Sequence, residues 1–164
     1  MFSITIVPDK PQWLDGLLRF FKRVRRYQHL RVIRLVPLAH AEPYAERKNY
    51  KLMFIKVREL GFETGAEYAD ICERAFAIGY TLCPAWVAVQ LGLQYLQKEF
   101  SFTLKGELHR YKCVYVAMRP LPNCMGSPFA FVLMDAFGTD LLYADYVYPH
   151  TRFFPDDTLL FWSP

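Results

Sequence analysis

The sequence predicts an α+β domain that combines a mostly antiparallel sheet with about three helices. Strand patterns occur near the N-terminus and again from about residue 110 to the end of the chain. Between them lie segments with helical periodicity and clear signals for helix starts and stops. The expected order is β-α-β-β-α-α-β-β-β-β, which is typical of the α+β class.

The N-terminal part is expected to hold a strand, a basic amphipathic helix, a second strand and a loop. Residues 2–7 (FSITIV) alternate between apolar and polar side chains, as in a half-buried strand, and Pro8 ends the pattern. Residues 11–27 place eight apolar side chains on one side of a helix and four cations on the other. The β-branched run at 30–36 favours a short strand, and the polar, proline-broken residues 37–50 favour a loop.

The middle of the chain holds one more predicted strand and the two best-marked helices. Residues 52–60 (LMFIKVREL) alternate again and predict a strand. Thr64 and Glu67 match a T-x-x-E capping box, which predicts the start of a helix that ends at Gly79 in a left-handed conformation. A second helix is expected to follow at once, with Cys83 as its N-cap residue and a proline in its first turn.

The C-terminal part has the pattern of four strands. The first is predicted at 111–118 (YKCVYVAM), and the nearly all-apolar run that follows at 128–137 suits a strand buried on both faces. The turn FGTD joins this run to another strand, so that residues 129–147 predict a hairpin. The last strand is expected at 158–162 (TLLFW).

Length and composition indicate a single domain of residues 1–164. The chain has 53% hydrophobic and 17% aromatic residues, enough for a sizeable core and too many for a disordered chain. The net charge of +4 is unevenly placed, because residues 1–58 hold 13 Lys or Arg against 4 Asp or Glu. Residues 59–164 hold 7 against 12. The imbalance permits a second organisation, in which a basic N-terminal subdomain at 1–50 packs on a module at 51–164.

The chain has the features expected of a cytoplasmic protein. The N-terminus (MFSITIVPDK) lacks the basic start and apolar run of a secretory signal, and no apolar stretch reaches the roughly 18 residues of a membrane-spanning helix. The four cysteines contain no C-x-x-C pair, so the usual zinc-ribbon spacing is missing. We therefore expect reduced, mostly buried thiols and no association with membranes.

Residues 57–122 resemble a pattern found in a family of uncharacterised bacterial proteins. The matching segments are VRELGF, YADICERAFAIGYTLCPAWVAVQLGLQY and AMRPLP, which carry LGF, Y-x-D-I-x-x-R-A, G-x-x-LCPA-x-V, Q-L-x-L-Q-Y and M-x-P. The resemblance implies no activity and no site. It implies that residues 57–164 are one recurring module to which the basic N-terminal part is attached.

The motifs of familiar nucleotide-binding sites and hydrolases are missing. The sequence contains no G-x-x-x-x-G-K-[ST], no G-x-G-x-x-G and no G-x-S-x-G. The histidines are too far apart to predict a metal site from sequence spacing. We therefore expect a protein that is not an enzyme and that holds no cofactor or metal.

Two groups of residues are nonetheless candidates for chemistry. Cys83, at a predicted helix N-terminus, would have a lowered thiol pKa, and His109 would be an activating base. The alternative is a buried thiol in the apolar segment LCPAW. The C-terminal acids would serve as an acid–base pair, as cation ligands or simply as turn residues: Asp135, Asp140, Asp145, Asp156 and Asp157.

The most lopsided feature is the basic segment, residues 19–34 (RFFKRVRRYQHLRVIR), with seven Lys or Arg and no Asp or Glu. A helix that only faces solvent usually mixes both signs to gain favourable pairs. The functional interpretation is contact with phosphates, with aromatic rings stacking on exposed bases. The residues nominated for it are Arg19, Lys22, Arg23, Arg26, Arg31 and Arg34, together with Tyr27 and His29.

Two hypotheses of function follow from this segment, beside the interpretation that it is only a solvated face. The first is a small binding module that contacts nucleic acid through residues 19–34, with affinity that weakens steeply as salt rises. The alternative is a protein-interaction module of the inhibitor, immunity or anti-defence type, which binds an acidic or apolar protein surface. In that case the aromatic-rich C-terminal strands are expected to leave an exposed apolar patch.

Overall fold

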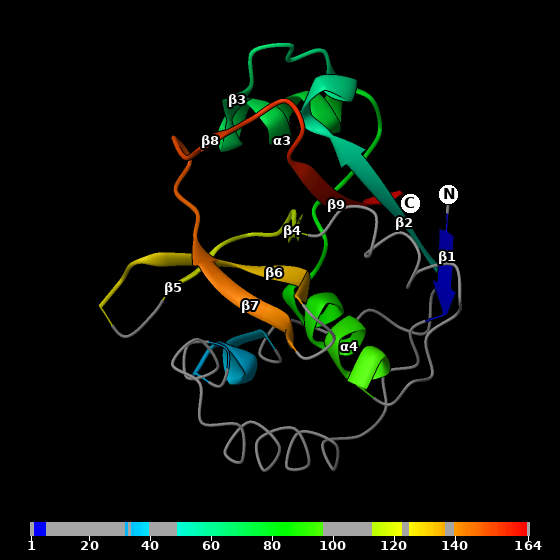
Figure 1. The fold of residues 1–164 in the computed structure, drawn as a ribbon, viewed down its shortest axis with the longest axis vertical. Helices are drawn as coiled ribbons and strands as arrows, with labels where there is room; N and C mark the ends of the chain where they lie inside the picture. Colours follow the sequence, from blue (N-terminus) through cyan, green and yellow to red (C-terminus); the bar gives the residue numbers. More distant parts are fainter. Residues whose placement is uncertain are drawn as a thin grey trace.

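The computed structural model describes residues 2–5, 32, 34–39, 49–96, 113–122, 125–136 and 140–163. Over these residues the chain forms a seven-stranded sheet, a separate two-stranded sheet and helices that connect and cover them (Figure 1). All strand pairs of the large sheet are antiparallel except one, so the predicted α+β class with a mostly antiparallel sheet is confirmed.

The order of strands across the large sheet is β1-β2-β9-β4-β6-β5, and β7 also pairs with β6. The parallel pair is β4 with β9. Its strands are β1 (Phe2–Thr5), β2 (Asn49–Lys56), β4 (Cys113–Val116), β5 (Leu121–Pro122), β6 (Pro128–Ala136), β7 (Asp140–Tyr146) and β9 (Thr158–Ser163).

The last strand of the chain lies in the interior of the sheet. β9 pairs with β2 on one side and with β4 on the other, and its residues Leu159, Leu160 and Phe161 are completely buried. This explains the apolar run TLLFW, because a strand with neighbours on both edges and cover on both faces contains few polar side chains. The predicted final strand is therefore confirmed.

The predicted hairpin is also confirmed. β6 and β7 pair antiparallel from Phe129 opposite Tyr146 to Leu133 opposite Leu142, with an irregularity between Leu133 and Ala136. The side chains from Phe129 to Leu133 are all buried, as expected for a strand covered on both faces.

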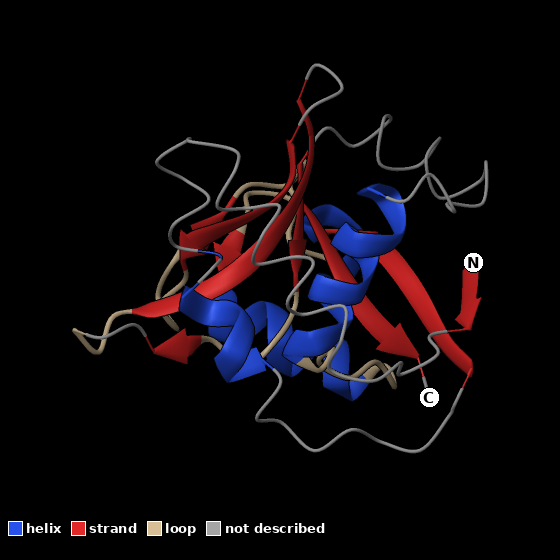
Figure 2. Ribbon diagram, turned by 90° about the horizontal axis from the view of Figure 1, so that it is seen from below, coloured by secondary structure: helices blue, strands red, loops and turns tan. Residues whose placement is uncertain are grey.

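Between β2 and β4, the described residues form two α-helices and one 3₁₀-helix. They are η1 (Val57–Leu60), α3 (Tyr68–Ala77) and α4 (Ala85–Leu96), and Figure 2 shows the helices (blue) packed against the strands (red). α4 packs on β6 and β7, and a Cβ at Gly92 would lie 3.2 Å from Cβ of Leu142. A glycine inside this helix therefore allows a close approach between helix and sheet, which offsets its low helix propensity.

The strand predicted at 30–36 is wrong, because residues 34–39 are helical. The buried side chains are Val32, Leu35, Val36 and Ala39, whose spacing of three and four residues is that of a helix face. The local preference of valine and isoleucine for strands had favoured the opposite assignment, and burial of this face outweighs it.

The predicted capping box is also wrong. Ala66 and Glu67 form strand β3 (Ala66–Glu67), which pairs with β8 (Arg152–Phe153), and α3 begins only at Tyr68. Glu67 takes the N-cap position without a side-chain hydrogen bond. The end of this helix is as predicted, because Gly79 follows it with φ of 92°, in the left-handed region.

The residues before position 50 that the structure describes share the sheet and the core with the rest of the chain. β1 pairs with β2, and the buried residues of the 34–39 helix belong to the same hydrophobic cluster as α4, β6 and β9. The alternative organisation, with a subdomain at 1–50 and a module at 51–164, stays a prediction.

Candidate functional site

Arg34 is the one nominated residue of the basic segment that the structure describes. It is exposed on the helix at 34–39, away from the buried side of that helix, with Leu38 exposed one turn later. The cation is therefore available to a ligand from a helix rather than from the expected strand. The other nominated residues lie outside the described part of the chain: Arg19, Lys22, Arg23, Arg26, Tyr27, His29 and Arg31.

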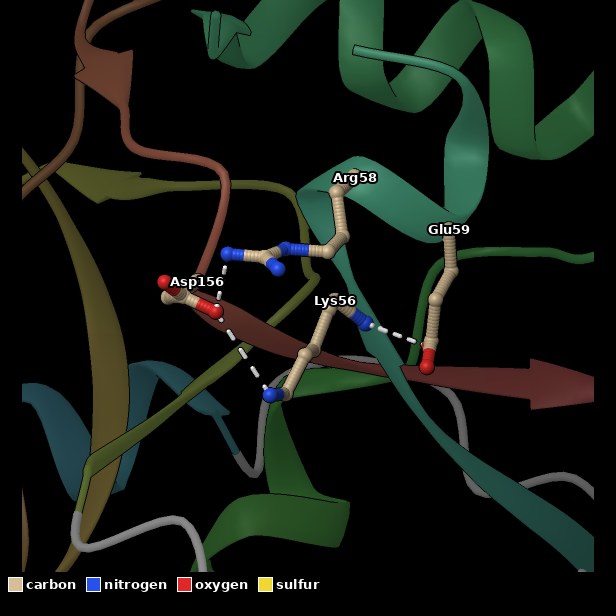
Figure 3. Close-up of polar contacts among 4 residues, drawn as sticks. All are labelled: Lys56, Arg58, Glu59 and Asp156. Carbon is tan, nitrogen blue, oxygen red and sulfur yellow. Dashed lines mark hydrogen bonds and ion pairs between the residues drawn. The ribbon is translucent and has the colours of Figure 1, made fainter. Parts of the chain in front are cut away.

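Two basic residues, Lys56 at the end of β2 and Arg58 in η1, are engaged within the protein (Figure 3). Arg58 and Lys56 form ion pairs with Oδ1 of Asp156, at 2.5 and 3.6 Å, and the backbone N–H of Lys56 donates to Glu59 Oε2 at 2.9 Å. This Asp156 carboxylate offsets local positive charge and connects the turn before β9 to η1. Arg58 and Lys56 are therefore weaker candidates for phosphate contact than the exposed Arg34.

Cys83 is buried, which contradicts the prediction of a lowered pKa. Only 2% of the residue is exposed, its thiol donates to the backbone oxygen of Leu160 at 3.4 Å, and its N–H donates to the oxygen of Ala117 at 2.7 Å. Burial raises the pKa of the thiol far above its ordinary value. Because α4 begins two residues later, at Ala85, the prediction that Cys83 is its N-cap residue is wrong. The alternative of a buried thiol is confirmed.

A polar cluster that the sequence did not predict lies across β4 and β7. The Tyr115 hydroxyl donates to Oδ2 of Asp145 at 3.0 Å, and Oδ1 of the same carboxylate accepts from the N–H of Tyr146 at 2.8 Å. Cys113 is half-buried nearby, and burial, assisted by the negative charges of Asp157 and Asp145, raises the pKa of its thiol to about 11.

The phenol and the thiol of this cluster have raised pKa values. Burial and the neighbouring Asp145 carboxylate also raise the pKa of Tyr115, so that phenol and thiol are both protonated near neutral pH. A protonated thiol is a poor nucleophile, and a tyrosine that donates to a carboxylate cannot act as a base. No local pattern could have predicted the contact, since Tyr115 and Asp145 are 30 residues apart.

Two of the described C-terminal acids, Asp156 and Asp157, serve in a turn and in ion pairs. Oδ2 of Asp157 accepts from the N–H of Phe154 at 2.7 Å, while its own N–H donates to the oxygen of Phe154 at 3.0 Å. Together with Asp156, Asp157 holds the turn before β9, as the turn interpretation of these acids predicts. The side chains of Asp135 and Asp140 and the residue His109 lie outside the described part.

The described residues contain no group of three His, Cys, Asp or Glu side chains that is placed to hold a metal ion. Of the four histidines, only His150 is described, and its ring stacks on Tyr148 with centroids 5.4 Å apart. In the same part of the chain, no helix is long and apolar enough to cross a membrane.

Several large apolar side chains are exposed on turns and on α3. Met125 is 81% exposed in the turn before β6, and Phe154 is 66% exposed in the turn before β9. Phe76 and Ile78, at the end of α3, are 49% and 48% exposed. Within the described C-terminal strands the phenylalanines are buried, whereas Tyr146 of β7 is 39% exposed. The apolar patch expected on those strands stays a prediction.

No protein-family model, curated protein or solved structure matches this chain.

Proposed function

We propose that the protein is a small binding module without catalytic activity, which contacts the phosphates of nucleic acid through the basic segment. The observation that carries this proposal is a run of seven cations and no acid over sixteen residues. Several cations that act together release counterions from nucleic acid, which gives affinity without requiring a pocket.

Two features of the described residues support the proposal. Arg34 is exposed on the outer side of a helix whose inner side is anchored in the core, so that the cation is presented from a fixed support. In addition, the groups best placed to act as nucleophiles, Cys83, Cys113 and Tyr115, have raised pKa values. A binding role is therefore better supported than acid–base or nucleophilic catalysis.

A titration against labelled single-stranded and duplex DNA and RNA tests the proposal. Fluorescence anisotropy at low and at physiological salt is expected to show affinity that falls steeply, with a slope of log K of about −0.9 per neutralised phosphate on duplex DNA. Changing Arg19, Lys22, Arg23 and Arg26 to Glu is expected to abolish binding. Failure of all four nucleic acids to bind at low salt would overturn the proposal.

A matched pair of single variants tests the described cation. Arg34→Glu and Lys51→Glu make the same charge change at exposed positions, but only Arg34 belongs to the basic segment. Arg34→Glu is expected to weaken binding several-fold and to reduce the salt slope by about one phosphate. An equal loss in both variants would show that net charge, and not this segment, determines affinity.

The second candidate function is protein interaction, and the exposed apolar residues favour it. Met125, Phe154, Phe76 and Ile78 are large apolar side chains that are exposed to solvent. Exposed apolar surface is typical of protein-binding sites. If a protein partner binds there, Phe76→Ser is expected to abolish a pull-down while leaving the melting temperature nearly unchanged. A pull-down that depends on Arg19, Lys22, Arg23 and Arg26 instead would place that partner on the basic segment.

A further inference from the structure

We draw no further inference here: the strongest candidate, the surface patch of exposed rings formed by Tyr146 at the end of β7 and by Tyr148 and His150 in the turn that follows, carries nothing because nothing in the described part of the structure shows what covers it.

Discussion

The hydroxyl of Tyr68 hydrogen-bonds both backbone polar groups of Met118, as a neighbouring strand would. It donates to the backbone oxygen of Met118 at 2.7 Å and accepts from the backbone N–H of the same residue at 3.0 Å. Met118 lies just beyond the end of β4, where regular pairing stops, and it is fully buried. A single side chain of α3 thus satisfies both polar groups of a buried peptide segment, which otherwise carry a large desolvation penalty.

Replacing Tyr68 by Phe is expected to lower the free energy of unfolding by about 2 to 4 kcal/mol, since two buried backbone groups lose their partner at roughly 1 to 3 kcal/mol each. Urea denaturation followed by circular dichroism measures the change. The control is Tyr80→Phe, a half-buried tyrosine whose ring contacts Phe161 and loses only its hydroxyl. An equal, small effect of both substitutions would show that Met118 finds another partner.

Gly65 is expected to be intolerant of any side chain. Its φ is 83°, and an added Cβ would lie 2.3 Å from the backbone oxygen of Phe153, on the strand that pairs with β3. Gly79 has a similar φ of 92° with open space around the same position. Gly79→Ala therefore measures only the free-energy cost of holding an alanine in the left-handed conformation, which is about 1 to 2 kcal/mol.

Gly65→Ala is expected to cost that amount and more, because backbone atoms of two paired segments must separate. The difference between the melting temperatures of the two variants isolates the steric part. Equal melting temperatures would mean that β3 and β8 can move apart at no cost.

How far the sequence predicts this fold depends on the distance between the interacting residues. The β6–β7 hairpin follows from local alternation and a turn, and both partners lie within twenty residues of each other. In contrast, Thr64 and Glu67 match a local cap, but pairing of Glu67 with Arg152, 85 positions away, makes that segment a strand. Val32 and Val36 prefer strands locally, and only burial in the tertiary structure makes them helical.

The candidate sites follow the same rule. The basic segment is contiguous in sequence, so its charge can be read directly. The contacts of Tyr68 with Met118 and of Tyr115 with Asp145 join residues 50 and 30 positions apart, and no spacing within the sequence marks them. The proline after Cys83 predicted a helix start at this position and therefore a reactive thiol. In the structure α4 begins later and the thiol is buried.

The raised pKa values of buried Cys83 and Tyr68 predict a loss of stability at alkaline pH. The ordinary pKa values are 9.0 for the thiol and 10.0 for the phenol, and burial raises both in the folded chain. Above pH 9 the unfolded chain therefore releases protons that the folded chain retains, and the free energy of unfolding falls. Each such group contributes about 1.4 kcal/mol per pH unit.

Cys83→Ala is expected to make this decline shallower, by up to about 1.4 kcal/mol per pH unit as the pH rises from roughly 9 to 10.5. Urea denaturation at a series of pH values measures the slope. Val116→Ala, which also shortens a completely buried side chain, is expected to lower stability by a constant amount with the natural slope. If both variants decline alike, the thiol of Cys83 titrates normally in the folded protein.

The last prediction concerns the boundary near residue 50. A chain that begins at Asn49 loses β1 from the edge of β2 and exposes the core surface against which Val32, Leu35 and Val36 pack. Burial of one such side chain contributes roughly 1.5 to 3 kcal/mol, so their loss approaches the 5 to 15 kcal/mol that stabilises a whole domain. We therefore expect the shortened chain to lose cooperative unfolding in urea.

Leu35→Ala and Leu38→Ala refine the test within the full chain. Both shorten a leucine of the same helix, but Leu35 is buried and Leu38 is exposed. Leu35→Ala is expected to lower the free energy of unfolding by about 2 to 5 kcal/mol in one cooperative transition, and Leu38→Ala by far less. A shortened chain that unfolds cooperatively, together with a Leu35→Ala chain that melts in two steps, would instead establish residues 51–164 as an independent module, because loosening the N-terminal part would then leave the rest intact.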